Sequence, residues 1–509
     1  MTRKTLHFLF VPAMMTVLLA GCSSNLTSSN LTPTAGTVPV SISMTDDPPA
    51  GVQVLFFQVS LTAATLTPQT GSPVSLLSGS TPVQIDVTQL QALSAFLSTA
   101  DIAPGTYTGL SLTFASPQLV IYNQSDTAIA STCAVGSVCM LTPTFDNNTT
   151  SLSFTSAPFP VSVSATSPLG FLVDFHLDTV VQSDLSVNLA ATNGVSISTP
   201  PPSRTMGFVS GTVGTVNSTN DTFTLQTAWG RIFTVDTGSS TTYGSFPTSA
   251  CATAGFSCVA QGQVVQVGVS SVASGGVITA SSVTYLQEAT AQSAEGTIIR
   301  LTPSTTSGAP PIGFDMIMHT SWGNNSNFPW GGKASVTLGS STTYAIDSNG
   351  FTLPTGAAYT FSGASNLAVG QTVTVTVEPG TLSNNGGGPG SNGWGPPRGV
   401  SFTASVVALQ PSQVTGWITN VDSSTTSFTL GVGLGPLFAP WPMASPNAVS
   451  FNVVTASGTT YTGFSTDSFS GLATNDFVSV NGWLFSPTTS GGTPNIVAQS
   501  VVLRSNMWF

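Results

Sequence analysis

Charged side chains are scarce in this chain: Asp, Glu, Lys and Arg make up 5% of its 509 residues. Eight residues are basic and nineteen are acidic, which gives a formal net charge of -11 at pH 7. Nucleic-acid binding requires a basic surface that displaces counterions from phosphates. The composition therefore excludes nucleic acid as a partner, and with it electrostatic binding to anionic lipid headgroups. The acidity itself keeps a weakly charged chain soluble.

Histidine is rarer still, with three residues in the whole chain. Two of them, His176 and His319, follow the N-terminal segment, and they fall in different predicted domains. A Ser-His-Asp triad or a multi-histidine metal site would require a meeting across those domains. The sequence also lacks the patterns H-E-x-x-H, G-x-S-x-G and G-x-x-x-x-G-K. We therefore predict that the protein is not an enzyme and holds no cofactor and no metal.

Cysteine is scarce as well, with five residues, and the first of them carries the strongest local signal. A basic start, Arg3 and Lys4, precedes an apolar run over residues 6–20, which is the layout of a secretory signal peptide. The run ends in small residues and Cys22, and here the chain resembles bacterial lipoprotein precursors. That resemblance implies cleavage before Cys22 and lipid on its thiol. An ordinary signal peptide with an incidental cysteine is the alternative.

The residue after the cysteine bears on location. Ser23 at this position resembles lipoproteins that are passed on to the outer membrane, so we expect an exported bacterial lipoprotein at that membrane. Residues 22–36, which are rich in Ser, Thr and Asn, are predicted to form a flexible tether.

The four remaining cysteines form two local pairs. Cys133 and Cys139 lie in one Gly/Ser/Ala-rich loop, and Cys251 and Cys258 lie in another. Exported compartments permit disulfides, and closing a loop this short stabilises the fold by about 2 kcal/mol. A metal site is the weaker interpretation, because neither spacing is C-x-x-C and no histidine lies nearby.

Long helical patterns are also largely missing, whereas strand patterns are abundant. Thr and Val alternate through residues 372–377, and 50 Gly and 34 Pro divide the chain into short segments. Period-two alternation of β-branched residues predicts half-buried strands, and many such strands predict sandwiches or barrels. The clearest helical segment is expected at residues 90–97. After the signal, no apolar run is long enough for a transmembrane helix.

The chain divides at changes in composition and at a Pro-rich linker. The predicted divisions are a lipoprotein signal peptide 1–21, a flexible tether 22–36, a β-sandwich domain 37–198, a Pro-rich linker 199–205, and three β repeats at 206–288, 289–410 and 411–505.

Four landmarks identify the first domain. They are Thr-Asp-x-Pro at residues 45–48, Ile-Asp-Val at 85–87, Pro-Gly-x-Tyr at 104–107 and Leu-Val-Asp-Phe at 172–175. In this order they resemble the lipoprotein domain of unknown function four-three-eight-two. The resemblance implies a prealbumin-like or immunoglobulin-like β-sandwich and no established activity.

The last three units share four sequence anchors. Each opens on a Gly-led strand, at Gly211, Gly296 and Gly416, and continues to a Thr-Thr-Tyr turn at residues 241–243, 342–344 and 459–461. A strand beginning at residue 262, 370 or 475 follows, and then a final Val-rich strand. The units resemble the domain of unknown function five-six-six-six. We predict three small, closed or half-closed antiparallel barrels, since closure removes exposed strand edges.

Aromatic loops are the candidate contact sites. Trp330 and Trp441 lie in Pro-flanked loops at the same stage of repeats two and three, Trp229 lies in the shorter loop of repeat one, and Trp394 lies in a further loop of repeat two. Exposed Trp on rigid loops can stack on sugar rings or on a protein partner. The alternative is that each Trp caps the end of its own barrel.

Acidic residues offer a weaker candidate for a cation site. Asp174, His176 and Asp178 alternate along one predicted strand and so share a face. Asp46 and Asp47 precede two prolines, where carboxylates commonly shape a turn. No neighbouring ligand set completes the Asp46–Asp47 pair, and an exposed polar strand face explains the group of Asp174, His176 and Asp178 equally well.

The sequence as a whole favours a non-catalytic, lipid-anchored cell-envelope protein: a modular β-rod with a binding, adhesive or scaffolding role. Its expected partners are the membrane, through the N-terminal lipid, and a glycan or an envelope protein. The alternative is a carbohydrate-binding surface lipoprotein that uses the Trp-bearing loops. A hydrolase with carboxylate chemistry is a distant third.

Overall fold

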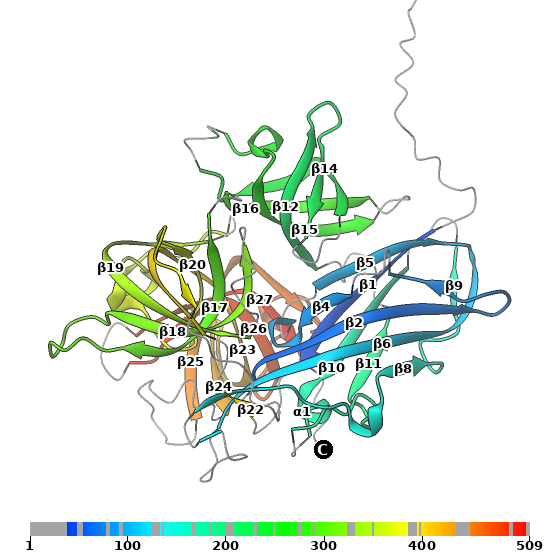
Figure 1. Ribbon diagram of the computed structural model, residues 1–509, viewed down its shortest axis with the longest axis horizontal. Helices are drawn as coiled ribbons and strands as arrows, with labels where there is room; N and C mark the ends of the chain where they lie inside the picture. Colours follow the sequence, from blue (N-terminus) through cyan, green and yellow to red (C-terminus); the bar gives the residue numbers. More distant parts are fainter. Residues whose placement is uncertain are drawn as a thin grey trace, which may run out of the picture.

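β-Strands make up nearly all of the regular structure in the computed structural model (Figure 1), as the alternating sequence predicts. The structure describes residues 38–47, 54–77, 82–90, 95–123, 133–134, 137–164, 169–182, 185–199, 207–227, 232–247, 251, 253–272, 277–288, 291–322, 331–348, 351–384, 394–395, 399–433, 448–487 and 492–504. Within these residues no helix is long and apolar enough to span a membrane.

The first unit is a β-sandwich. One sheet has the order β11-β10-β1-β5, in which β1 is parallel to β10. The other is built on the long pair β2 and β6. The strands of the first sheet are β1 (Val38–Asp47), β5 (Ala95–Ile102), β10 (Leu169–His176) and β11 (Val195–Ser198). Those of the second are β2 (Val54–Pro68), β3 (Val74–Ser75), β4 (Val83–Asp86), β6 (Gly105–Tyr122), β7 (Val138–Leu141), β8 (Ser151–Phe154) and β9 (Val161–Val163). A single-turn helix, α1 (Leu177–Val180), follows β10.

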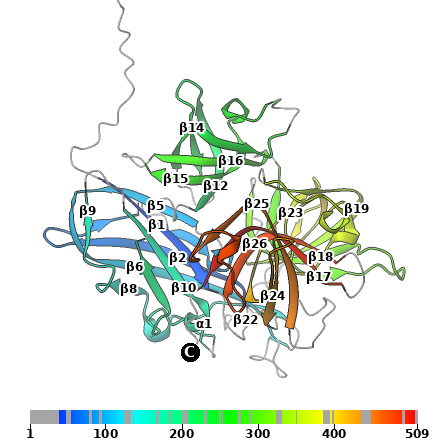
Figure 2. The same cartoon turned by 180° about the vertical axis from the view of Figure 1, so that it is seen from behind.

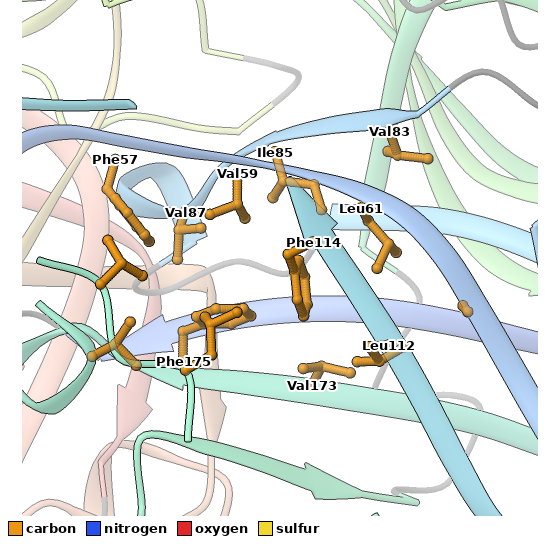
Figure 3. Packing of buried hydrophobic residues seen from close by; sticks show 14 of the residues in the cluster. Phe57, Val59, Leu61, Val83, Ile85, Val87, Leu112, Phe114, Val173 and Phe175 are labelled. Atoms are coloured by element: carbon orange, nitrogen blue, oxygen red, sulfur yellow. The ribbon is translucent and has the colours of Figure 1, made fainter. Parts of the chain in front are cut away.

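The two sheets of the sandwich enclose one apolar core (Figure 3). Alternate residues of β2, Phe57, Val59 and Leu61, point into it and are fully buried. Phe114 of β6 meets Phe175 of β10 edge to face, with ring centroids 5.6 Å apart. The period-two pattern of the sequence therefore corresponds to the inward faces of the two sheets.

The predicted helix at residues 90–97 is wrong. A 3₁₀ helix ends at Leu90, and β5 begins at Ala95. Phe96 and Ala95 pair with Ser43 and Met44 of β1. A helix of eight residues is marginal on its own, so the hydrogen bonds offered by the edge of β1 decide the conformation.

Three five-stranded barrels follow, and all have the same topology. In each, the first strand pairs with the second and the fourth, and the fifth lies between the third and the fourth. Barrel 1 contains β12 (Phe208–Asn217), β13 (Thr222–Gln226), β14 (Ile232–Gly244), β15 (Gln263–Val272) and β16 (Ile278–Glu288). Barrel 2 contains β17 (Ser293–Thr302), β18 (Gly313–Trp322), β19 (Lys333–Ile346), β20 (Thr372–Val377) and the first half of β23 (Gly399–Asp422). Barrel 3 contains the second half of β23, β24 (Ser427–Gly433), β25 (Ala448–Thr462), β26 (Phe477–Phe485) and β27 (Asn495–Leu503).

The expectation of a purely antiparallel arrangement needs one correction. The fifth strand runs parallel to the third in every barrel, as β16 does to β14, β23 to β19 and β27 to β25. The order 1-2-3-5-4-1 with this parallel pair is that of the OB-fold, a five-stranded Greek-key barrel. Closure pairs both edges of each sheet, which is the advantage expected from the sequence.

The recurring glycines mark places where two strands approach closely. A Cβ atom on Gly211, Gly296 or Gly416 would lie 2.3–2.5 Å from a backbone oxygen of the second strand. The facing oxygens belong to Gln226, Ile317 and Gly431. Such contacts exclude any side chain, so the Gly-led strand is a packing requirement of the barrel.

The Thr-Thr-Tyr phrase links the third strand to the fifth strand by side-chain hydrogen bonds. The first Thr hydroxyl of each phrase donates to a carbonyl of the fifth strand and accepts from a backbone N–H three residues earlier. The donated bonds are Thr241 to Ala280 at 2.8 Å, Thr342 to Ala404 at 2.7 Å and Thr459 to Ala498 at 2.7 Å. The accepted bonds come from Gly238 at 3.0 Å, Gly339 at 2.9 Å and Ala456 at 2.9 Å. The repeated phrase thus has a structural cause in all three barrels.

The four units contact one another through continuous strands and shared sheet edges. β23 ends barrel 2 and begins barrel 3 without a break. Phe208 of β12 pairs with Ala95 at the edge of the sandwich, and β22 (Trp394–Gly395) extends the other sheet at β7. Figures 1 and 2 show barrel 1 above the other two barrels, with the sandwich beside them. Barrel 2 contacts the sandwich directly, whereas modules of an extended rod would touch only their sequence neighbours.

Candidate functional site at the junction of the sandwich and barrel 2

The junction between the sandwich and barrel 2 has an apolar half. Leu55 and Phe56 of β2, Val120 of β6 and Met140 of β7 pack against Ile317 of β18. All five side chains are buried, with Phe56, Val120 and Ile317 at 0% exposure. Excluding water from this much apolar surface makes the contact a stable one.

The junction also has a polar half, centred on His319. Nδ1 of His319 lies 2.6 Å from Oδ2 of Asp86, and Nε2 lies 2.9 Å from Oγ1 of Thr297. The side chains of His319 and Asp86 are 3% and 7% exposed. Thr88 holds the other carboxylate oxygen through its backbone N–H and its hydroxyl, at 3.1 Å and 2.5 Å. Because the carboxylate only accepts, Nδ1–H donates to it, and Nε2 shares the second hydrogen bond with the Thr297 hydroxyl.

The strand pattern places His319 at this interface. Met316 and Met318 point into the core of barrel 2, so Ile317 and His319 point outward toward the sandwich. Thr297 lies on the outer face of the neighbouring strand β17, and Asp86 is the last residue of β4 in the sandwich. The polar chain therefore joins two units that are far apart in sequence.

A second carboxyl group, Glu295, lies on the same outer face of β17. Burial raises the pKa of Glu295 to about 7. His319 opposes that rise, whereas the carboxylates of Asp347 and Asp86 add to it. A hydrogen bond with Thr374 of β20 also favours the ionised form. Perturbed carboxyl groups gather at functional sites and in structural ion networks alike, so geometry has to decide between these interpretations.

Asp347 ties the three barrels together close to this point. Its Oδ1 accepts from the hydroxyl of Ser245 in barrel 1 at 2.9 Å, and its Oδ2 accepts from the amide of Gln410 at 3.2 Å. Its backbone carbonyl accepts from the indole N–H of Trp483 in barrel 3 at 2.9 Å. One residue of barrel 2 thus holds both neighbouring barrels.

The order hydroxyl, imidazole, carboxylate is that of a nucleophile, a base and an orienting acid. With the sandwich docked, however, the ring of His319 is closed to a substrate, since 3% of its side chain is exposed. In this arrangement the hydrogen bonds among Asp86, His319 and Thr297 are buried and hold the sandwich against barrel 2. The sequence does not reveal this meeting, because Asp86 lies in a different predicted domain from His319 and Thr297. A lone histidine in the strongly apolar strand β18 was the available signal that this strand has a polar partner.

The two predicted disulfides are confirmed. Cys133 and Cys139 are bonded, with a Cα–Cα distance of 5.8 Å, and both are buried in the sandwich. Cys251 and Cys258 are bonded with a Cα–Cα distance of 5.3 Å. Both loops therefore close locally, as their spacing predicts.

Most of the predicted tryptophan sites cannot be placed. Cys22, Trp229, Trp330 and Trp441 lie outside the described residues. For Trp394 the backbone is described, and it pairs with Leu141 at the edge of the sandwich.

The predicted cation face is only partly correct. Asp174 and His176 share a face of β10, with Oδ2 and Nε2 4.0 Å apart. β10 ends at His176, however, and Asp178 lies in α1, so the alternation stops there. Asp46 and Asp47 end β1 beside Phe175 and His176. Among the described residues, no group of three or more His, Cys, Asp or Glu is placed to hold a metal ion.

What the fold and junction define is a class: an all-β protein in which a sandwich and three OB-type barrels are joined by buried contacts. No family model matches the chain, and no curated protein matches its sequence. The resemblances to the two uncharacterised families therefore remain predictions.

The raised pKa of Glu295 predicts a specific pH dependence. A folded-state pKa of about 7, above the ordinary 4.5, means that the native state binds more protons than the unfolded state between those values. Stability therefore falls as the pH rises through this window, by at most about 3 kcal/mol. Glu295→Gln mimics the protonated form and should raise the unfolding temperature at about pH 8 but not at about pH 4.

Calorimetry over this pH range checks the expectation. Glu288→Gln is the control, because Glu288 is exposed at the end of β16, and it should give no comparable pH-dependent difference. An equal gain from Glu295→Gln at both ends of the range would contradict the assignment.

Proposed function

We propose that the protein is a non-catalytic, lipid-anchored component of the cell envelope that presents rigid binding surfaces. The observation that carries the proposal is the buried junction. His319 and Asp86, which elsewhere could do chemistry, lie between units and join them, and Glu295 lies on the same outer face of barrel 2. A hydrolase that used these groups would need the sandwich to separate from barrel 2.

The rigid connection between the sandwich and the three barrels favours a binding role. The sandwich and barrels are connected by the continuous strand β23, by the Asp347 contacts and by the shared edges at β5 and β7. Surfaces that are already ordered lose less conformational entropy when a partner binds. A fold by itself does not define an activity, so the proposal rests on how the units are held and not on the barrel topology.

The predicted anchor supplies the location. Lipid on Cys22, followed by a polar tether, would hold the folded units at a membrane surface, and two or more acyl chains make such anchoring stable. The two disulfides support an oxidising, exported environment.

The experiment that tests this proposal is lipid labelling of Cys22→Ala. The variant should lose incorporation of labelled palmitate and move from the membrane fraction to the soluble fraction. Ser24→Ala is the matched control and should keep both. Ser23→Asp should keep the label but change the membrane in which the protein is found. Palmitate labelling of Cys22→Ala, or a soluble wild type, would contradict the proposal.

A further inference from the structure

The three barrels allow one face to be compared position by position. In barrel 2, the outer face of the first, second and fourth strands is centred on Thr297. Thr297 pairs with Ile317 of β18 and with Thr372 of β20. The sandwich covers this face, since Ile317 is fully buried against Leu55 and Phe56.

The equivalent face of barrel 3 has different residues. Trp417 occupies the position of Thr297, one residue after the Gly that begins each unit. It pairs with Gly431 of β24, in the place of Ile317, and with Phe477 of β26, in the place of Thr372. Ile418 and Phe428 point into the barrel core, so Trp417 lies on the outside.

Trp417 and Phe477 form an aromatic platform on this outer face. Their ring centroids are 4.8 Å apart, with an interplanar angle of 44°. Trp417 is 37% exposed, and among the described residues it is the one exposed large aromatic side chain. Gly431, on the other side of Trp417, has no side chain to cover the indole. The methyl group of Thr419 fills the space beside Gly431, because a Cβ atom there would lie 3.0 Å from it.

One exposed hydroxyl group, that of Thr419, lies beside the platform, and a buried hydrogen-bonded group lies beneath the neighbouring strand positions. The hydroxyls of Thr415 and Ser479 lie 2.8 Å apart, and Nε of Arg504 donates to Ser479 at 3.1 Å. Thr419, at the position of the apolar Ile299 in barrel 2, is exposed and donates to the carbonyl of Thr429 at 3.3 Å. Apolar contacts that the sandwich uses on barrel 2 are therefore replaced by an aromatic pair, the exposed Thr419 and a buried hydrogen-bonded group that includes Ser479 and Arg504.

We propose that the Trp417 platform, formed by Trp417, Phe477 and Gly431, binds a pyranose ring of a neutral glycan. A sugar ring offers an apolar C–H face to an indole and hydroxyl groups to the exposed side chain of Thr419. A second β-sandwich would need apolar side chains such as Ile317 and Ile299, and this face lacks them. The inference rests on the binding role proposed above and adds the class of ligand.

The test uses the full chain and three soluble probes: cellohexaose, maltohexaose and chitohexaose, each measured by isothermal titration calorimetry. At least one should bind the wild type, and Trp417→Ala should weaken that binding at least about tenfold. Trp417→Phe, which keeps an aromatic face, should retain part of the affinity. Ile232→Ala is the matched control, because Ile232 is an exposed apolar residue of barrel 1, and it should bind like the wild type.

Three outcomes would overturn the inference. The first is that no probe binds the wild type, and the second is that Trp417→Ala binds as the wild type does. The third is that Trp417→Ala changes the oligomeric state measured by light scattering without a change in glycan binding, which would assign the platform to a second copy of the chain. None of these outcomes affects the lipid-labelling result, so failure of the glycan site and failure of the anchor remain distinguishable.

Discussion

Replacing Trp483 with alanine is expected to destabilise barrels 2 and 3 together, by about 3–5 kcal/mol. Trp483 lies on β26 of barrel 3, yet it is fully buried in the apolar cluster of barrel 2. Its ring packs on Phe351 with centroids 5.1 Å apart, and its N–H donates to the carbonyl of Asp347. Truncation would open a large cavity and leave that buried carbonyl without its donor.

Calorimetry should show the loss as a lower unfolding temperature for both barrels. Trp417→Ala is the matched control, because it removes the same side chain from a position that is 37% exposed, and it should cost clearly less than Trp483→Ala. Trp483→Phe keeps most of the packing and loses the N–H, so an intermediate loss is expected. If Trp483→Ala changed the unfolding temperature no more than Trp417→Ala does, this would contradict the conclusion that Trp483 stabilises a core shared by the two barrels.

The elements with a local cause could be predicted from the sequence. Alternation of Thr and Val over β20 predicts strand structure, because Val373 and Val375 face the core while the intervening Thr residues face outward. The two disulfides close loops of a few residues and need no information from the rest of the fold. The repeated Gly and Thr-Thr-Tyr phrases predicted three like units. In the structure each Gly lies at a close backbone contact, and the first Thr of each phrase is hydrogen-bonded to the fifth strand.

Features that depend on distant partners could not be predicted. The segment that became β5 has a helical pattern, but the edge of β1 lies beside it in the fold. The position of each fifth strand between the third and the fourth follows from closure of the barrel, and the alternation pattern carries no sign of it. Alternation also assigns a residue to an outer face without saying whether another unit covers that face. Thr297 and Trp417 occupy the same position in two barrels, one at the junction with the sandwich and the other exposed.

The candidate junction was hidden from the sequence for the same reason. Asp86 and His319 are 233 positions apart, and neither belongs to a catalytic or metal-binding motif. Asp86 belongs to the Ile-Asp-Val phrase at residues 85–87, and its contact with barrel 2 gives that phrase a physical role. The pKa of Glu295 is raised because several elements bury its carboxyl group, and the sequence of one strand does not reveal that burial.

Breaking the Asp86–His319 pair is the second change with a large expected effect. Asp86→Ala leaves His319 buried without its carboxylate, and His319→Ala leaves Asp86 buried without its donor. Removing one partner of a buried charged pair typically costs about 3–5 kcal/mol. Thr297→Val removes only the hydroxyl group that is hydrogen-bonded to His319, so a loss of stability of about 1 kcal/mol is expected.

A double-mutant cycle separates this contact from the apolar half of the junction. The variant with both Asp86→Ala and His319→Ala should lose less stability than the two single losses added together, because no unpaired partner remains buried. In calorimetry each single variant should split the unfolding of the sandwich from that of barrel 2. Additive losses in the cycle would show that the two side chains do not interact, and the junction would then depend on the contacts of Phe56, Met140 and Ile317 alone.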